Sequence, residues 1–420
     1  MMAGHALCWL LVSAVFAYVN SKISTTANDF VFTFINAYED ANIPGVLLLA
    51  LVSNNNNGTA NVVVTSPYPL FTTIKVSVAP YSVLKIPITP ESIEDQYPGD
   101  NYTWLDHIIV EDKGVRLQSD LPVAVYAHAE FYSGVSADSF LVIPAVHLGM
   151  QYVAVTSTNK APLSRNMIAV VAYQDNTQVT IGTQTVTINA LQVASIASTA
   201  FLSGTVLSGN KPFGAISGCT DANDGHFQSG DYEAVMLLPV GVWGTQFTAI
   251  PFMYFSTNSY QVVSNTDNTV VSARDKIIAT LNVGEYRNFS IGAALVTSNY
   301  PVQLIQIGED TGGQDDLGGA FFLQLPSTDK MSNTSVLFQP TGFFEYYYAP
   351  LPLQFIIRIV TNLAGAGTIK LDGTTISALQ FKHVPYSNFY YYESRTLNTT
   401  HSVTTNNPET KYSVSLSVLN

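Results

Sequence analysis

The sequence predicts an all-β protein made of tandem repeats of about 90 residues, each built from short antiparallel strands. The first observation is a repeated pattern, because Pro122, Pro212 and Pro301 lie 90 and 89 residues apart and each begins an apolar run. Self-similarity at a fixed period is the signature of a repeat architecture. The second observation is the density of short runs rich in Val, Ile, Thr, Phe and Tyr, which turn residues separate. The third is that no segment of about eleven residues shows the helical period of 3.6.

Each of the two full copies contains four phrases in the same order. In the first copy they are Asp120-Leu121-Pro122-Val123, an apolar run ending at Pro144, Leu148-Gly149 and Asp175-Asn176-Thr177. In the second they are Asn210-Lys211-Pro212-Phe213, a run ending at Pro239, Trp243-Gly244 and Asp267-Asn268-Thr269. The prolines are expected to begin strands, a position where a strand tolerates proline. Asp-Asn-Thr before an apolar residue is typical of a hairpin turn.

These repeats favour β-sandwich-like units, with a β-propeller as the alternative. A propeller blade takes about 40–45 residues, so a 90-residue repeat would need paired blades. The predicted division is a signal peptide at 1–21, an N-terminal half-repeat at 22–105, repeat 1 at 106–205, repeat 2 at 206–296, and a divergent third repeat with a C-terminal cap at 297–420. Two aromatic runs in the last part, 343–348 and 389–392, are expected to pack in the core or on edge strands.

The ordered phrases resemble the N-terminal domain of the IgG Fc-binding protein family. The resemblance covers roughly residues 29–330 and is carried by the Asp120-to-Val123 strand, Pro144, Leu148-Gly149 and the Asp-Asn-Thr turns. A third copy departs from the pattern, since Met331 stands where glycine is expected and residues 362–365 replace the turn. The resemblance implies a non-enzymatic extracellular binding or matrix protein of the mucus type. The family name implies contact with immunoglobulin Fc.

The N-terminus and the sequons predict secretion. An apolar run from Ala6 to Ala17, with small residues for cleavage after it, is typical of a signal peptide and is shorter than the ~20 residues of a membrane span. An N-terminal membrane anchor is the alternative, and no later segment qualifies as a span. Five Asn-x-Ser/Thr sequons predict N-glycosylation in a secreted glycoprotein. They begin at Asn57, Asn101, Asn288, Asn333 and Asn398.

The composition argues against nucleic acid and anionic membranes as partners. The formal net charge is −13, and Lys and Arg number only 17 in 420 residues. Such a chain lacks the basic surface that phosphate backbones attract. The expected partner is an extracellular protein or glycan.

Cys219 is the only cysteine outside the predicted signal peptide, so no intrachain disulfide is expected. A leftover cysteine in a secreted protein is either a buried free thiol or half of an intermolecular bridge. A Cys219-linked dimer therefore stays open beside the buried thiol.

No cofactor is expected, and metal binding has one weak candidate. Two acidic loops at corresponding positions of successive repeats supply oxygen ligands of the kind calcium prefers, but they lack the EF-hand spacing. Their candidate ligands are Asp221, Asp224, Asp231, Asp310, Asp315 and Asp316. Solvated acidic loops are the alternative. His128, with Glu130 two residues on, is expected to be a satisfied or solvated histidine, since no zinc-type pattern accompanies it.

Catalytic signatures are weak. The chain contains no Gly-x-Ser-x-Gly elbow, and two acidic pairs, Glu130 with Asp138 and Asp231 with Glu233, are the candidates for glycoside hydrolysis. Together with the resemblance to the IgG Fc-binding protein family, these observations predict a secreted, non-enzymatic extracellular binding, adhesion or mucus-type matrix protein. The alternative is a secreted glycan-directed hydrolase on a β-propeller, which would show a deep funnel lined by convergent carboxylates.

Overall fold

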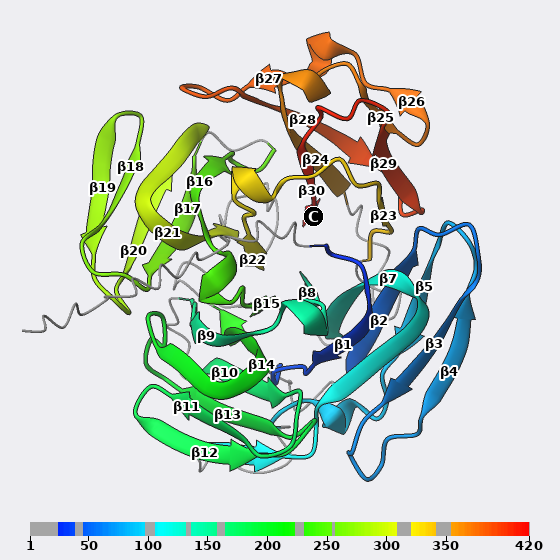
Figure 1. Ribbon diagram of the computed structural model, residues 1–420, viewed down its shortest axis with the longest axis vertical. Helices are drawn as coiled ribbons and strands as arrows, with labels where there is room; N and C mark the ends of the chain where they lie inside the picture. Colours follow the sequence, from blue (N-terminus) through cyan, green and yellow to red (C-terminus); the bar gives the residue numbers. More distant parts are fainter. Residues whose placement is uncertain are drawn as a thin grey trace, which may run out of the picture.

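The computed structural model describes residues 24–37, 45–96, 106–131, 136–157, 164–222, 231–253, 257–308, 321–341 and 354–419. In these ranges the secondary structure is β-strands and short 3₁₀ turns, without an α-helix. The predicted all-β fold is confirmed. The predicted signal peptide at 1–21 lies outside the described residues. Figure 1 shows the strands gathered in groups around a common centre.

The strands form three large sheets and two small ones in the described residues. Unit 1 contains β1 (Ala27–Phe32), β2 (Val46–Asn54), β3 (Ala60–Thr65), β4 (Ile74–Val78), β5 (Ser82–Pro87), β7 (Val115–Phe131) and β8 (Ala137–Leu141). Unit 2 contains β6 (Ile109–Glu111), β9 (Gly149–Val153), β10 (Asn166–Ala172), β11 (Thr177–Ile181), β12 (Gln184–Ile188), β13 (Val193–Ser198), β14 (Val206–Ala222) and β15 (Asp231–Met236). Unit 3 contains β16 (Gly244–Ala249), β17 (Asn258–Ser264), β18 (Thr269–Ala273), β19 (Lys276–Leu281), β20 (Tyr286–Ile291), β21 (Ala294–Gly308) and β22 (Phe321–Gln324).

The C-terminal unit has one sheet of β23 (Val336–Phe338), β29 (His401–Thr405), β25 (Ile369–Leu371) and β26 (Thr374–Thr375). Its second sheet contains β27 (Lys382–His383), β28 (Phe389–Thr396), β24 (Gln354–Asn362) and β30 (Tyr412–Leu419). The 3₁₀ turns are η1 (Glu91–Ile93), η2 (Ala145–His147), η3 (Val240–Val242), η4 (Thr328–Lys330), η5 (Leu363–Gly365) and η6 (Ala378–Gln380).

Units 1 to 3 share one topology, in which a long strand of 15 to 17 residues runs through both halves of a sandwich. The strand orders are β4-β3-β7-β2-β5, β12-β11-β14-β10-β13 and β19-β18-β21-β17-β20. In unit 1 the first part of β7 lies between β1 and β3, and its second part lies between β2 and β8. Apolar side chains of both halves fill the space between them. These sandwich-like units are what the repeat length favoured, rather than single-sheet propeller blades.

The repeated prolines do not begin strands, as the sequence had suggested. Pro122, Pro212 and Pro301 lie inside the long strands, at the point where the strand passes from one half-sheet to the other. The pairing register shifts there, for example between Ser208 and Phe213 in the ladder of β9 with β14. A residue without an N–H is tolerated at such an interruption because no ladder bond is lost.

The prediction that the Asp-Asn-Thr segments form hairpin turns is also wrong. Asp175-Asn176-Thr177 joins β10 to β11, and those strands pair with β13, β14 and β12 but not with each other. The turn therefore crosses between the halves of the sandwich. Asn176 has φ 54°, a left-handed conformation that asparagine adopts more readily than most residues. Asp175 Oδ1 accepts a hydrogen bond from Ala190 N at 3.0 Å, and Asp267 does the same for Val283.

The boundaries of the sheets do not coincide with the boundaries of the predicted repeats. The predicted boundary after residue 105 separates β1–β5 from β7 and β8, yet β7 is hydrogen-bonded to β1, β2 and β3. The strands β1 to β5, which lie within residues 22–105, therefore share a sheet with β7 and β8, which lie beyond them. Whether the units fold as separate domains at those boundaries stays a prediction.

The C-terminal unit packs on unit 3 and on unit 1. Ser53 Oγ of β2 donates a hydrogen bond to Leu337 O at 2.7 Å, and Asn55 Nδ2 donates to Ser335 O at 3.1 Å. In β28 the side chains of Tyr390 and Tyr392 pack on one buried cluster and those of Phe389 and Tyr391 on another. This aromatic run therefore contributes to packing, and the run at 343–348 lies outside the described residues.

Candidate functional site

The predicted calcium loops fall mostly outside the described residues. Asp221 lies at the end of β14 and Asp231 at the start of β15, where Ala222 pairs with Asp231. Asp224, Asp310, Asp315 and Asp316 lie outside the described residues. Burial raises the pKa of Asp221. Within the described ranges, no three His, Cys, Asp or Glu side chains are grouped to hold a metal ion. The calcium site stays a prediction for the loops.

Four predicted glycosylation sites are exposed. The side chains of Asn57, Asn288, Asn333 and Asn398 all lie at the surface, and Asn101 lies outside the described residues. The fold brings two of them to one seam, because the turn carrying Asn57 contacts the segment just after Asn333 through the Asn55–Ser335 hydrogen bond. Glycan attachment itself stays a prediction.

His128 is the centre of a hydroxyl–imidazole–carboxylate arrangement that the sequence did not predict. His128 and Ser139 are cross-strand partners on β7 and β8, and His128 Nδ1 lies 2.7 Å from Ser139 Oγ. His128 Nε2 lies 3.1 Å from Glu130 Oε2, because residues two apart on a strand share a face. These are the atoms that an activated serine requires.

Two features favour a packing role for the imidazole and its carboxylate partner. The side chains of His128 and Glu130 are each only 2% exposed, whereas Ser139 lies at the surface of β8. The Ser139 N–H, a natural oxyanion donor, instead donates to Asp138 Oδ1 at 2.7 Å. His128 is therefore a buried histidine with a partner on each ring nitrogen.

The acidic pairs considered for glycoside hydrolysis are not arranged for it. Ala129 pairs with Asp138 and Glu130 with Ala137, so the side chains of Glu130 and Asp138 point to opposite faces of their hairpin. Asp231 and Glu233 do share a face of β15, but Glu233 is fully buried. Burial holds its pKa well above the ordinary value. A hydrolase needs both carboxyl groups at the bond that is broken.

Asp138 joins the three sandwich units. Its Oδ2 accepts hydrogen bonds from Ala234 N of β15 at 3.0 Å and from Phe322 N of β22 at 3.4 Å. Asp138 lies on β8, so one carboxyl group accepts hydrogen bonds from the backbone of all three units, whose strands β8, β15 and β22 lie near the centre of Figure 1. Burial raises its pKa to about 7, although the three backbone N–H donors oppose the shift. The Asp138 carboxyl group therefore links the three units.

We expect the free energy of unfolding to fall as the pH rises from about 4 to about 7. The folded pKa of Asp138, about 7, lies above the ordinary value of 3.8, so the folded chain binds this proton more tightly than the unfolded chain. The stabilisation is complete below about pH 4 and is lost as the pH rises through about 7, at up to ~1.4 kcal/mol per pH unit. Urea unfolding across that window measures the slope. Asp138→Asn should reduce it, and an unchanged slope contradicts the assignment.

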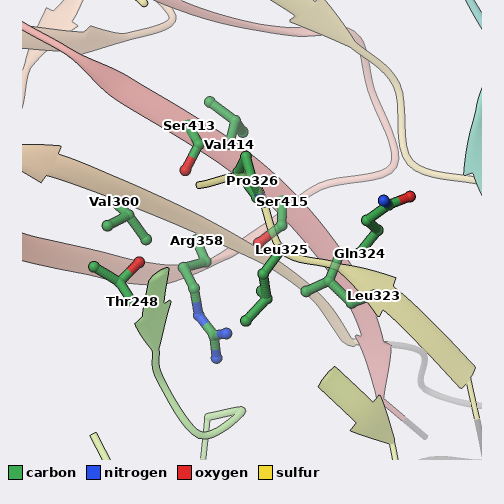
Figure 2. Close-up of a pocket in the computed structure, with 10 residues that line it drawn as sticks. All are labelled: Thr248, Leu323, Gln324, Leu325, Pro326, Arg358, Val360, Ser413, Val414 and Ser415. Carbon is green, nitrogen blue, oxygen red and sulfur yellow. The ribbon is translucent and has the colours of Figure 1, made fainter. Parts of the chain in front are cut away.

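The pocket shown in Figure 2 lies where unit 3 meets the C-terminal unit. Its lining comes from Thr248, Leu323, Gln324, Leu325, Pro326, Arg358, Val360, Ser413, Val414 and Ser415. Its volume is about 60 Å³, far below the ~300 Å³ at which small-molecule sites begin. Arg358 is its one charged lining residue, and that guanidinium is already paired with Glu393 at 2.7 Å. The pocket is a packing gap at the joint.

Cys219 is expected not to react in the folded protein. It lies in β14, is 0% exposed and has its Sγ 3.1 Å from Ser164 Oγ. Burial raises the pKa of the thiol to about 12, so little reactive thiolate forms. An aromatic disulfide reagent at about pH 8 should modify Cys219 only in denaturing urea. Rapid modification without urea would revive the proposed Cys219-linked dimer, which this burial disfavours.

The geometry thus defines a class of protein: an all-β scaffold of sandwich units whose buried ionisable groups hold the units together. The family model described as IgGFc binding protein matches residues 138–415. The chain belongs to that family. The match extends beyond residue 330, where the repeated phrases fade, and takes in most of the C-terminal unit.

Other comparisons add little. No curated protein matches the chain. A crystal structure of Thermotoga maritima 1070 is similar over 28% of this chain and 92% of its own, at 11% identity and a TM-score of 0.19. That score carries no argument about the fold. In the described residues no helix has the length and apolarity that crossing a membrane requires.

Proposed function

We propose that this chain is a secreted, non-enzymatic extracellular protein that binds another protein. The observation that carries the proposal is membership of the IgGFc binding protein family over residues 138–415. The family's name makes immunoglobulin Fc the first ligand to test. If Fc does not bind, glycan arrays would test a glycan as the ligand instead.

The chemistry of the scaffold supports binding over catalysis. His128, Glu130 and Glu233, which have the chemistry of an acid or a base, are buried, and His128 contacts Ser139 and Glu130. Four sequons lie on the exposed surface, which suits a protein that passes through the secretory pathway. Loops on a rigid β scaffold are common sites of recognition. The surface of the described residues thus supports binding of a partner through shape complementarity and backbone hydrogen bonds.

Expression of the full chain in cultured animal cells tests the proposal. The protein is expected in the medium, with a mass that falls on treatment with an N-glycan-removing amidase. Immobilised IgG Fc should then retain it, while the matched Fab fragment should not. Retention inside the cell would contradict secretion. Release into the medium with no affinity for Fc or for any protein of an extracellular extract would contradict the binding function.

A further inference from the structure

The three sandwich units have equivalent edge strands, and the cross-strand registers align them residue by residue. Ser53, Val171 and Val263 each pair with the residue two positions after a repeated proline. On their other side these residues pair with Val83 of β5, Val193 of β13 and Tyr286 of β20. Counting four residues on, Pro87, Ala197 and Ser290 occupy one equivalent position.

At that position the backbone N–H and C=O groups point away from the inner strand of the sheet, toward its open side. In unit 2, Ala197 O accepts a hydrogen bond from Asp106 N, next to the added strand β6, at 2.8 Å. Neighbouring residues point inward, as the bonds from Ala172 N to Gln192 O and from Ser264 N to Glu285 O show. Because these directions alternate along a strand, Tyr286, Asn288 and Ser290 of β20 present their backbone groups outward.

The first two edges are closed. In β5 the outward position is Pro87, which has no N–H to offer, and Lys85 occupies the outward position before it. Proline and lysine are the residues by which natural sheets block edge pairing. In β13 the edge is covered by β6, with Ser195 paired to Ile109 and Val193 to Glu111. Every residue of β13 is buried as a result.

The third edge is open beyond its first residue in the part of the chain that the structure describes, since only Tyr286 stacks on Phe201 of unit 2, with 6.2 Å between the ring centroids. β20 is the last strand of its sheet, and Arg287, Asn288 and Ser290 are exposed. Two of these residues, Asn288 and Ser290, belong to the sequon Asn288-Phe289-Ser290. Asn288 Oδ1 accepts a hydrogen bond from Gln261 Nε2 at 2.8 Å, whereas a glycan is attached to Nδ2. A sugar there would stand beside the open backbone edge.

We propose that the edge of β20 binds an extended segment of another protein by strand addition, and that a glycan on Asn288 closes this site. The occupant is argued from the chain itself, since the equivalent edge of unit 2 already holds an extended strand, β6. Main-chain hydrogen bonds supply the affinity in this mode of recognition. The inference rests on the proposed protein-binding function and places it on one strand.

The test compares Ser290→Pro with Ser290→Ala in the full chain. Both variants destroy the sequon, but only proline removes an outward N–H, and Pro87 shows that the fold accepts proline at this position. The probe is a fluorescent synthetic peptide with the sequence of residues 106–113, which includes β6. Fluorescence anisotropy measures its binding, and amide hydrogen exchange locates it.

Ser290→Ala should bind the peptide and gain protection at the amides of Tyr286 and Asn288. Ser290→Pro, and the glycosylated natural chain, should bind at least about tenfold more weakly. A peptide N-methylated at Ile109 and Glu111, the residues paired with β13, should fail, while N-methylation at Val110 should be harmless. These peptides decide the question even if Ser290→Pro does not fold.

Several results would overturn the inference. They are equal affinity of the proline and alanine variants, no binding by Ser290→Ala, and protection of β13 instead of β20, which would mean exchange with β6. Dimerisation of Ser290→Ala through β20 would make a second copy the occupant instead. Equal affinity of the glycosylated chain would remove the role of the glycan. If Fc or another extracellular protein still binds in any of these cases, only the edge site falls and the proposed function stands.

Discussion

Arg358→Ala is expected to lower the free energy of unfolding by about 3–5 kcal/mol, because it leaves a buried carboxylate without its partner. Arg358 and Glu393 have side chains only 6% exposed and are joined from Nη2 to Oε1 at 2.7 Å and from Nε to Oε1 at 2.8 Å. Arg358 also donates to Pro251 O at 2.6 Å and to Gln306 Oε1 at 3.2 Å. Those two residues belong to unit 3, so the substitution also loosens the joint with the C-terminal unit.

Urea unfolding measures the loss, and a matched double variant separates its causes. Arg358→Met with Glu393→Leu removes both charges and keeps apolar volume, so it should be much less destabilising than Arg358→Ala. Replacing exposed Arg287 with alanine is the surface control and should change stability by less than about 0.5 kcal/mol. A loss below about 1 kcal/mol for Arg358→Ala would show that Glu393 finds another partner or reaches water.

The fold class was predictable because its signals are local. Alternating apolar residues, turn residues and a fixed spacing of prolines depend on neighbours in the sequence, and the structure confirms the all-β fold they predict. The residues at which one unit ends and the next begins could not be predicted in the same way. β7 pairs with β1 and β2 across more than 60 residues, and nothing local says whether a strand closes the unit before it or opens the next.

The repeated phrases were found correctly but given the wrong local roles. Asp120, Asn210 and Asn299 precede the repeated prolines, and each accepts a hydrogen bond from a backbone N–H of β3, β11 or β18. The motif therefore holds the crossover of the long strand against its neighbour. A proline flanked by a polar acceptor and an apolar residue signals such a crossover as well as it signals a strand start.

The roles of the buried polar groups were harder to predict than the fold. Asp138 and Arg358 sit in ordinary strand patterns, and their importance depends on which units meet there. One signal was available for Arg358, a charged residue in the middle of the apolar run from Phe355 to Val360. A charge at such a place needs a partner from elsewhere in the fold. The sequence contains no counterpart of that signal for Asp138, which lies next to loop residues.

Phe213→Ala is expected to lower the free energy of unfolding by about 3–5 kcal/mol, because it leaves a cavity where β14 passes between the halves of unit 2. Phe213 follows Pro212 directly and is fully buried, with its ring centroid 4.9 Å from that of Tyr152. The Tyr152 hydroxyl donates to Phe213 O at 2.5 Å, and Gly209 leaves no room for a β-carbon because the Phe213 ring would lie 2.8 Å away.

The neighbouring units provide the control for this substitution. Val123 and Val302 occupy the position of Phe213 after the other two prolines, so Phe213→Val keeps a side chain that this crossover is known to hold. We expect Phe213→Val to lose less stability than Phe213→Ala in urea unfolding, because the smaller cavity forfeits fewer contacts. Equal losses would mean that the Tyr152 ring contact, and not the filled volume, stabilises the crossover, and a near-normal alanine variant would show that unit 2 closes around the gap.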